Sequence, residues 1–187
     1  QGLRIFCEYR DKRSLPLLLP LLDQPCPVER MSAVYALGRN PCPSAVQKLV
    51  TLLKTDDNAY VRRATAWSLA NYDNQIVLEP LINALKNDVA AVRLWSSSSL
   101  AEIGNVSLKN AQLAAEQLLI SLKIDNESGV RSNCIWSLCR LYEKLNDIYQ
   151  ESFVDECTKI ALFDKEPSVM EEAKTALDSM GMQGFYN

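Results

Sequence analysis

The chain has 187 residues, 48% of them hydrophobic, and it carries 20 Lys and Arg against 23 Asp and Glu. This size and balance predict one globular domain over residues 1–187 and exclude a disordered or collagen-like chain. The longest apolar run, Leu15 to Leu22, contains two prolines and is far shorter than the roughly 20 residues that cross a bilayer. No basic segment leads into an apolar stretch at the start, so we expect a cytoplasmic protein without a signal peptide. Because Gln1 stands where a Met would be, we expect an upstream segment to be missing.

The chain contains no histidine. Histidine is the usual general base near neutral pH and the commonest metal ligand, so its absence excludes Ser-His-Asp sites, Cys-His sites and imidazole-bound metals. No two of the six cysteines have the C-x-x-C spacing of zinc or redox sites: Cys7, Cys26, Cys42, Cys134, Cys139 and Cys157. We expect reduced thiols packed in a helical core, with no metal site and no catalytic residue.

The first predicted elements are GLRIFCEYRD, a helix that lacks its own partner helix, and SLPLLLPLLD from Ser14. Five later segments then align without gaps: VERMSAVYALG from Val28, YVRRATAWSLA from Tyr60, AVRLWSSSSLA from Ala91, GVRSNCIWSLC from Gly129 and SVMEEAKTALD from Ser168. Their third positions, the anchors, are Arg30, Arg62, Arg93, Arg131 and Met170. The anchors recur at intervals of 32, 31, 38 and 39 residues, which indicates stacked helical repeats.

Each aligned segment has small residues three and six positions after the anchor and a Leu at the seventh. This i, i+3, i+4 stripe predicts the buried face of a helix, which we call the second helix of its repeat. The Leu-rich stretch upstream predicts the first helix, and each such stretch ends at an Asp: Asp23, Asp56 or Asp57, Asp88, Asp125 and Asp164. We expect these residues to end one helix and cap the next.

Two connections are longer, around residues 104–109 and 143–152, and they account for the intervals of 38 and 39 residues. Insertions in a repeat stack generally lie on one rim, where they add contact surface or lengthen helices. We expect longer helices.

The Val-Arg, small residue and Leu pattern, with the turn Asp11-Lys12-Arg13-Ser14-Leu15-Pro16, resembles HEAT-like repeats of the kind found in phycobilisome lyase subunits of cyanobacteria. The resemblance covers nearly the whole chain and implies an all-α fold, a right-handed α-solenoid of about five helix pairs after a leading half-repeat. Deoxyhypusine hydroxylase, which resembles this chain in its repeats, binds two irons with His-Glu pairs. Without histidine this chain cannot do so.

Positions one, four, five and eight after each anchor point away from the buried stripe at 100° per residue, and we expect them to line the concave face. Large side chains gather there, as is typical of recognition surfaces. The candidate partner-binding residues on and beside this column are Met31, Tyr35, Arg63, Trp67, Leu94, Trp95, Ile135 and Trp136. The alternative is that the column packs between adjacent second helices.

The charge is divided unevenly: residues 1–93 are net basic and residues 94–187 net acidic. The two halves either meet different partner surfaces or differ only in their solvated faces. The anchor arginines recur singly beside Asp residues rather than as a basic ridge, which argues against nucleic-acid binding. We expect each anchor Arg to hydrogen-bond the Asp-containing turn of its own or the next repeat.

These observations favour a non-catalytic protein-binding scaffold or chaperone without a cofactor. By resemblance its partner is a phycobiliprotein or a second HEAT-like subunit, in phycobilisome assembly or turnover. The alternative is a subunit of a phycobilin lyase, which would handle a phycobilin transiently. Such a lyase could use a thiol, and Cys7, near Arg4 and Arg10, is the best candidate by sequence.

Overall fold

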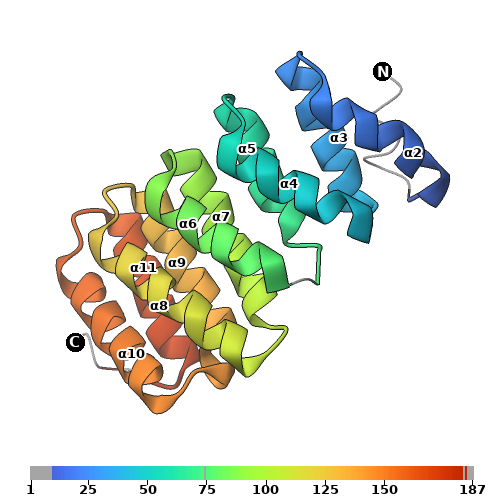
Figure 1. Ribbon diagram of the computed structural model, residues 1–187. Coiled ribbons are helices and arrows are strands. Elements are labelled where there is room, and N and C mark those ends of the chain that lie inside the picture. Colours follow the sequence, from blue (N-terminus) through green and yellow to red (C-terminus); the bar gives the residue numbers. More distant parts are fainter. Residues whose placement is uncertain (1–9, 74, 183, 185–187) are drawn as a thin grey trace. The chain divides into compact units, whose positions relative to one another are not determined.

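The computed structural model describes residues 10–73, 75–182 and 184. All regular structure in these residues is helical, with ten α-helices and four short 3-10 segments (Figure 1). The α-helices are α2 (Leu15–Leu18), α3 (Pro27–Arg39), α4 (Pro43–Thr55), α5 (Ala59–Leu69), α6 (Leu78–Asn87), α7 (Ala90–Gly104), α8 (Leu108–Ile124), α9 (Ser128–Leu141), α10 (Asp147–Phe163) and α11 (Pro167–Ser179). The 3-10 segments are η1 (Lys12–Ser14), η2 (Leu19–Asp23), η3 (Gln75–Val77) and η4 (Tyr142–Lys144).

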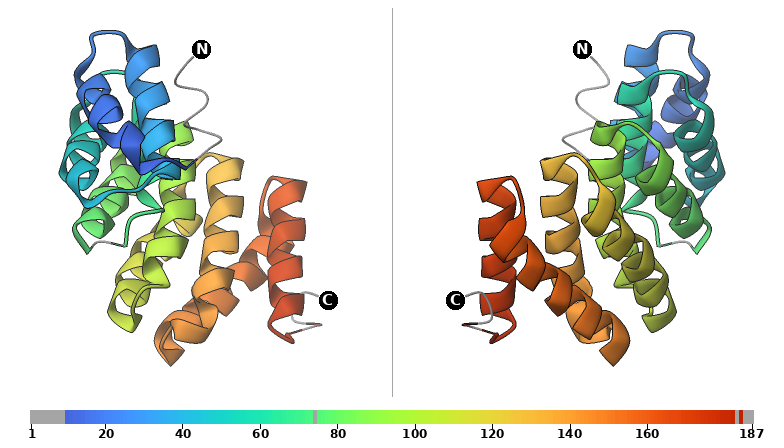
Figure 2. Two further views of the ribbon diagram at one scale, coloured as in Figure 1. Left: turned by 90° about the vertical axis from the view of Figure 1, so that its right-hand side faces the viewer. Right: turned by 90° about the vertical axis from the view of Figure 1, so that its left-hand side faces the viewer.

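The chain divides into two compact units, Gln1–Ile103 and Gly104–Asn187. In the first unit α3 packs along α5, and α4 packs on both α5 and α6. In the second unit α8 packs on α9 and α10, while α11 packs on α9 and α10 (Figure 2). First helices therefore contact first helices and second helices contact second helices, which is the packing of stacked helix pairs. The opening segment GLRIFCEYRD lies outside the described residues, except for its last two.

The predicted buried stripe is confirmed in all five repeats. The Leu at the seventh position is fully buried in each: Leu37, Leu69, Leu100, Leu138 and Leu177. The small residues at positions three and six are exposed by 4% or less: Ala33, Ala36, Thr65, Ser68, Ser96, Ser99, Cys134, Ser137, Ala173 and Ala176. Small side chains on this face allow helices to pack closely, and the larger leucines fill the space that remains.

The first predicted helix, SLPLLLPLLD, is divided. It forms α2 and then the 3-10 segment η2. Pro20 has no N–H to donate to the carbonyl of Pro16, and its ring crowds the preceding turn, so an α-helix cannot run through it. The longer connections do become longer helices, as expected. Helices α8 and α10 have 17 residues each, against 13 in α4 and 10 in α6.

The aspartates end the first helices but do not cap the second ones. Four of them are the C-terminal caps of α4, α6, α8 and α10: Asp56, Asp88, Asp125 and Asp164. The N-cap residues of α5, α9 and α11 are instead Asn58, Glu127 and Glu166. Each Asp carboxylate accepts a hydrogen bond from a backbone N–H one or two residues further on. The prediction that these aspartates cap the second helices is therefore wrong. Their carboxylates lie before the helix starts, and those of Asp56, Asp88 and Asp164 bind arginines.

Candidate functional site

The anchor arginines form a ladder between successive inter-helix turns. In the first unit Arg30 donates to both carboxylate oxygens of Asp56, through Nε at 2.7 Å and Nη2 at 2.9 Å. Its Nη1 donates to the carbonyls of Gln24 and Pro25, at 2.8 and 2.9 Å. One guanidinium thus joins the turn of its own repeat to the turn of the next. Both ends of the planar fork are used, which favours Arg over Lys at this position.

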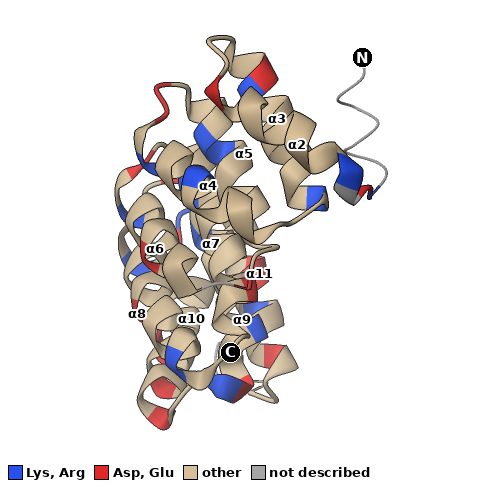
Figure 3. Ribbon diagram, turned by 45° about the vertical axis from the view of Figure 1, so that its right-hand side comes forward, with Lys and Arg blue, Asp and Glu red and all other residues tan. Residues whose placement is uncertain are grey.

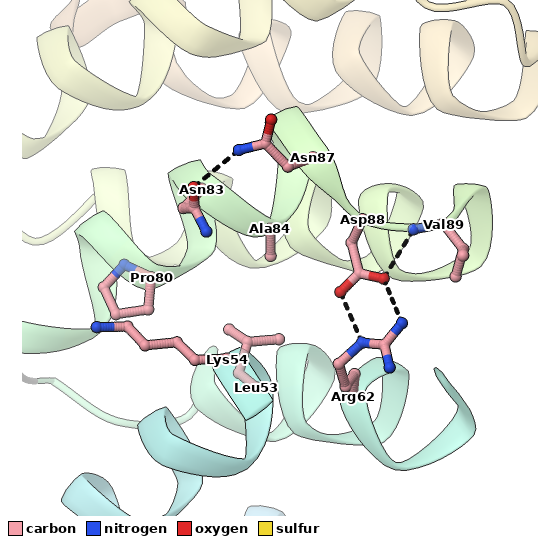
Figure 4. A pocket seen from close by; sticks show the side chains of 9 residues that line it. All are labelled: Leu53, Lys54, Arg62, Pro80, Asn83, Ala84, Asn87, Asp88 and Val89. Carbon is pink, nitrogen blue, oxygen red and sulfur yellow. Dashed lines mark hydrogen bonds and ion pairs between the residues drawn. The ribbon is translucent and has the colours of Figure 1, made fainter. Parts of the chain in front are cut away.

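Arg62 repeats the arrangement one repeat later. Its Nε and Nη2 donate to the carboxylate of Asp88 at 2.8 and 2.7 Å (Figure 4). Its Nη1 donates to the carbonyl of Asp56 at 2.7 Å. The pair lines a groove of about 350 Å³ that lies along α6 and beside the C-terminal end of α4. The guanidinium already has its partners within the chain, so Arg62 serves the ladder rather than presenting an unused cation in the groove.

In the second unit Arg131 makes the same bonds to the carboxylate of Asp164, at 2.9 and 2.7 Å, and to the carbonyls of Asp125 and Asn126, at 3.0 and 3.2 Å. The side chains of this ion pair are only 6% and 8% exposed. Burial alone would raise the pKa of Asp164, but hydrogen bonds from Arg131 and from the N–H of Glu166 outweigh it and lower that pKa. The predicted structural role of the anchor arginines is confirmed for these three.

A different cluster lies where α3 and α5 run side by side. On each helix a row of large side chains lies at this contact, with the spacing i, i+4, i+8 on α3 and i, i+3, i+7 on α5. We call them together the α3–α5 surface: Met31, Tyr35 and Arg39 from α3, and Tyr60, Arg63 and Trp67 from α5. The Tyr35 and Trp67 rings have centroids 5.3 Å apart and are tilted by 54°. Such tilted contacts are a favoured geometry for aromatic pairs.

Two guanidinium groups lie against these rings. Arg39 is 5.5 Å from the centroid of Trp67, and Arg63 is 5.5 Å from the centroid of Tyr60. Arg63 also donates through Nη2 to the Tyr35 hydroxyl at 3.5 Å, a long hydrogen bond. The arrangement holds flat rings and cations in fixed positions while leaving Tyr60 65% exposed.

Trp67 also serves the contact between the helices. A Cβ at Gly38 would lie 2.6 Å from a carbon of the Trp67 ring, so only glycine lets the indole approach α3 this closely. The side chain is half-buried. One part of the indole therefore packs between second helices, and another part remains accessible.

The structure brings four of the eight predicted binding residues into one cluster, namely those on α3 and α5. Leu94 and Trp95 lie on α7 and are half-buried. Trp136 lies on α9 in the second unit, where it is 40% exposed and has the Arg140 guanidinium 5.0 Å from its centroid.

Ile135 is fully buried and is removed from the candidate surface. It shares this position, the fourth after the anchor, with three other buried residues: Val34, Ala66 and Ser97. The expectation that the fourth position lines an open face is thus corrected. That position lies at the flank of the helix, and neighbouring helices cover the flank as well as the stripe.

Arg39 and Tyr60 were not among the predicted residues. Both lie outside the eight-residue span that was followed after each anchor, at nine residues after Arg30 and two before Arg62. Extending the i, i+4 spacing from Met31 and Tyr35 would have found Arg39, and stepping back three residues from Arg63 would have found Tyr60.

The described cysteines offer little nucleophilic character. Cys42, Cys134 and Cys157 are buried, Cys139 is half-buried, and Cys26 is exposed. Burial raises the pKa of Cys139 to about 11, and it raises the pKa of Cys157 well above the ordinary value. A thiol must ionise to attack, so these two are poor candidates. Cys7, the cysteine favoured by the sequence, lies outside the described residues.

In the part of the chain that the structure describes, no group of three or more Cys, Asp or Glu side chains is arranged to hold a metal ion. Nor does any helix in that part have the length and apolar character needed to cross a membrane.

Comparison with known proteins identifies the repeats. A family model of HEAT repeats matches residues 1–70 and 46–139. No curated protein sequence shows significant similarity to the chain. Three solved structures illustrate the similarity of fold. One is a chain from the complex of CpcE and CpcF of phycocyanin lyase from Nostoc sp. PCC7120, with 22% identity, a TM-score of 0.67, and coverage of 89% of this chain and 99% of that one.

The second is an engineered protein, with 22% identity, a TM-score of 0.70, and coverage of 96% and 89%. The third is a designed armadillo repeat protein in complex with the peptide (KR)4, with 18% identity, a TM-score of 0.67, and coverage of 100% and 90%. At these identities the matches show the fold alone, an all-α repeat solenoid of the HEAT/armadillo type.

Proposed function

Since the chain belongs to the HEAT repeat family, we propose that it is a non-catalytic scaffold or chaperone that holds a protein partner on the α3–α5 surface. The observation that supports this most is the half-exposed Tyr35–Trp67 pair with a guanidinium over the indole. Trp, Tyr and Arg dominate the centres of protein interfaces. Side chains already held by their neighbours lose little further freedom on binding, so more of the contact energy contributes to affinity.

The proposed partner is a phycobiliprotein, bound during phycobilisome assembly or turnover. This finer proposal rests on the sequence resemblance and on the shared fold with a chain of the CpcE and CpcF complex. The same structural similarity supports one alternative, a phycobilin lyase subunit that works with a second subunit and handles a bilin transiently. Against the alternative stand the lack of histidine and the raised thiol pKa values of Cys139 and Cys157.

Co-expression with a phycobiliprotein and the enzymes of bilin synthesis separates the two proposals. A scaffold forms a complex with the phycobiliprotein whether or not bilin is made, and covalent attachment of colour does not depend on the chain. A lyase subunit gives a covalently coloured phycobiliprotein only when the chain is present. Bilin-dependent colouring that requires this chain would replace the scaffold proposal with the alternative.

The binding surface is tested with single variants against the same phycobiliprotein. Trp67→Ala is expected to weaken binding by about 2 kcal/mol or more, as for a central aromatic contact. Trp136→Ala reports on the equivalent position in the second unit. Phe163→Ala is the matched control, because this aromatic residue on α10 is 81% exposed and belongs to a first helix. Equal affinity of the folded Trp67→Ala protein and the control would contradict the proposed surface.

A further inference from the structure

We infer that the partner segment held on the α3–α5 surface is acidic, an inference that rests on the proposed function and adds the chemistry of the partner. The surface presents two arginines, Arg39 and Arg63, that have no carboxylate partner among the described residues. The other arginines of these helices, Arg30 and Arg62, are held in the ladder by Asp56 and Asp88. Two cations are therefore left available beside the aromatic pair.

Of the two arginines, Arg63 gives the stronger evidence for an acidic partner. Its Nε is buried and has no hydrogen-bond partner in the described part of the chain. The only hydrogen bond of its guanidinium there is the 3.5 Å contact from Nη2 to Tyr35. A buried Nε without a partner costs free energy, and a carboxylate that accepts from the accessible edge of the fork would stabilise the guanidinium through charge-assisted hydrogen bonds. The group is also held in place by the Tyr60 ring, so it is oriented before a partner arrives.

Arg39 connects the α3–α5 surface to a neighbouring groove. It lies over Trp67 on one side and also lines a groove of about 480 Å³. That groove is lined in addition by Arg10, Asp11 and Leu15, together with the segment 40–43. The Asp11 carboxylate accepts three hydrogen bonds from the Arg13 side chain, at 2.7, 3.0 and 3.1 Å. An extended segment that crosses Arg63 and Trp67 would thus meet further positive charge beyond Arg39.

The surface itself carries no acidic group. Helix α5 contains no Asp or Glu, and the single acidic residue of α3, Glu29, is two residues from Met31 and so about 200° around the helix. The equivalent helix of the last repeat is different, because α11 carries three acidic residues and one lysine. Acidic positions are marked red on the ribbon in Figure 3. At the position after the anchor, Arg63 in the first unit corresponds to Glu171 in the second. An acidic segment therefore has a reason to choose α3 and α5 over α11.

A nucleic acid would also supply negative charge and flat rings. Its phosphates, however, are regularly spaced and call for a continuous basic ridge, whereas here two of the four arginines of α3 and α5 are occupied by aspartates. Isolated carboxylates with apolar or aromatic residues between them match two guanidinium groups beside Trp67 more closely. An acidic segment of a protein therefore fits this surface better than a nucleic acid does.

The test uses the full chain and fluorescently labelled twelve-residue peptides of alternating Glu and Ala, Gln and Ala, or Lys and Ala. We expect the Glu peptide to bind at least about tenfold more tightly than the Gln peptide, with affinity falling as salt is added. The Lys peptide should bind most weakly. The double variant Arg39→Gln/Arg63→Gln should remove the preference for Glu. Lys54→Gln/Lys86→Gln is the matched control, because it removes the same charge from exposed positions on α4 and α6.

Circular dichroism and thermal unfolding establish that each variant is folded before binding is compared. The inference is overturned if the Glu and Gln peptides bind equally, if the lysine control loses as much affinity as the arginine variant, or if a twelve-residue oligouridine binds more tightly than the Glu peptide. Binding of the phycobiliprotein separates this failure from that of the proposed function. If Trp67→Ala weakens that complex and Arg39→Gln/Arg63→Gln does not, the surface binds protein without a preference for acid. If neither weakens it, the proposed function also fails.

Discussion

Removing Arg131 is expected to destabilise the second unit more than any surface substitution there. The change Arg131→Met keeps the apolar stem but removes the guanidinium, which makes two bonds to the Asp164 carboxylate and two to turn carbonyls. Charge-assisted hydrogen bonds contribute roughly 1.5–3 kcal/mol each. The variant also leaves Asp164, whose side chain is 8% exposed, without its cation. Breaking a buried pair from one side in this way costs about 3–5 kcal/mol.

Urea and thermal unfolding followed by far-UV circular dichroism measure this loss. For a chain of this length a cost of about 3–5 kcal/mol corresponds to a fall in Tm of roughly 6–20 °C. Lys174→Met is the control, because its pair with Glu171 at 2.8 Å is largely open to solvent, with side chains 32% and 71% exposed. Exposed pairs contribute little, so the control should change stability by less than about 1 kcal/mol.

A second variant separates the ion pair from the loss of side-chain volume. In Arg131→Met/Asp164→Leu no carboxylate is left buried and unpaired, so part of the lost stability should return. The reasoning is refuted if Arg131→Met costs no more than the Lys174 control, or if the double variant is no more stable than the single one. Either result would mean that the ladder contributes little to the packing of α9 against the turn before α11.

The free energy of unfolding should fall at acidic pH because the pKa of Asp164 is lowered in the folded chain. The contribution of this carboxylate is present above the unfolded pKa of about 3.9 and is lost as the pH falls through the folded pKa. Asp164→Asn should therefore flatten this part of a titration of stability against pH. Gly38→Ala should cost about 1–3 kcal/mol in urea unfolding, because its Cβ would overlap the Trp67 ring, whereas a neutral result would show that the indole moves aside freely. In the native chain a thiol reagent should label Cys26 quickly and Cys157 slowly, as mass spectrometry after timed labelling can show, and equal rates would contradict the burial of Cys157.

The sequence by itself determined the repeat and the buried face. The spacing of Leu37, Leu69 and their equivalents, with small residues three and six positions after each anchor, predicted which side of every second helix is covered. The anchor arginines beside Asp turns likewise predicted the ladder. Both features depend on local periodicity and on pairs repeated at a fixed interval, and a single sequence displays these directly.

Only the tertiary structure decided which large side chains remain accessible. Ile135 and Trp136 are neighbours in sequence and of similar apolar character, yet one is fully buried and the other 40% exposed, because adjacent helices cover the flank that carries Ile135. In the same way Arg62 and Arg63 are adjacent, and only the fold shows that Arg63, unlike Arg62, has no carboxylate partner among the described residues and lies beside Tyr35 and Tyr60. Exposure and pairing are set by residues about 30 positions away in the sequence. Helical periodicity fixes the direction in which a side chain points, and the neighbouring helix fixes what it meets there.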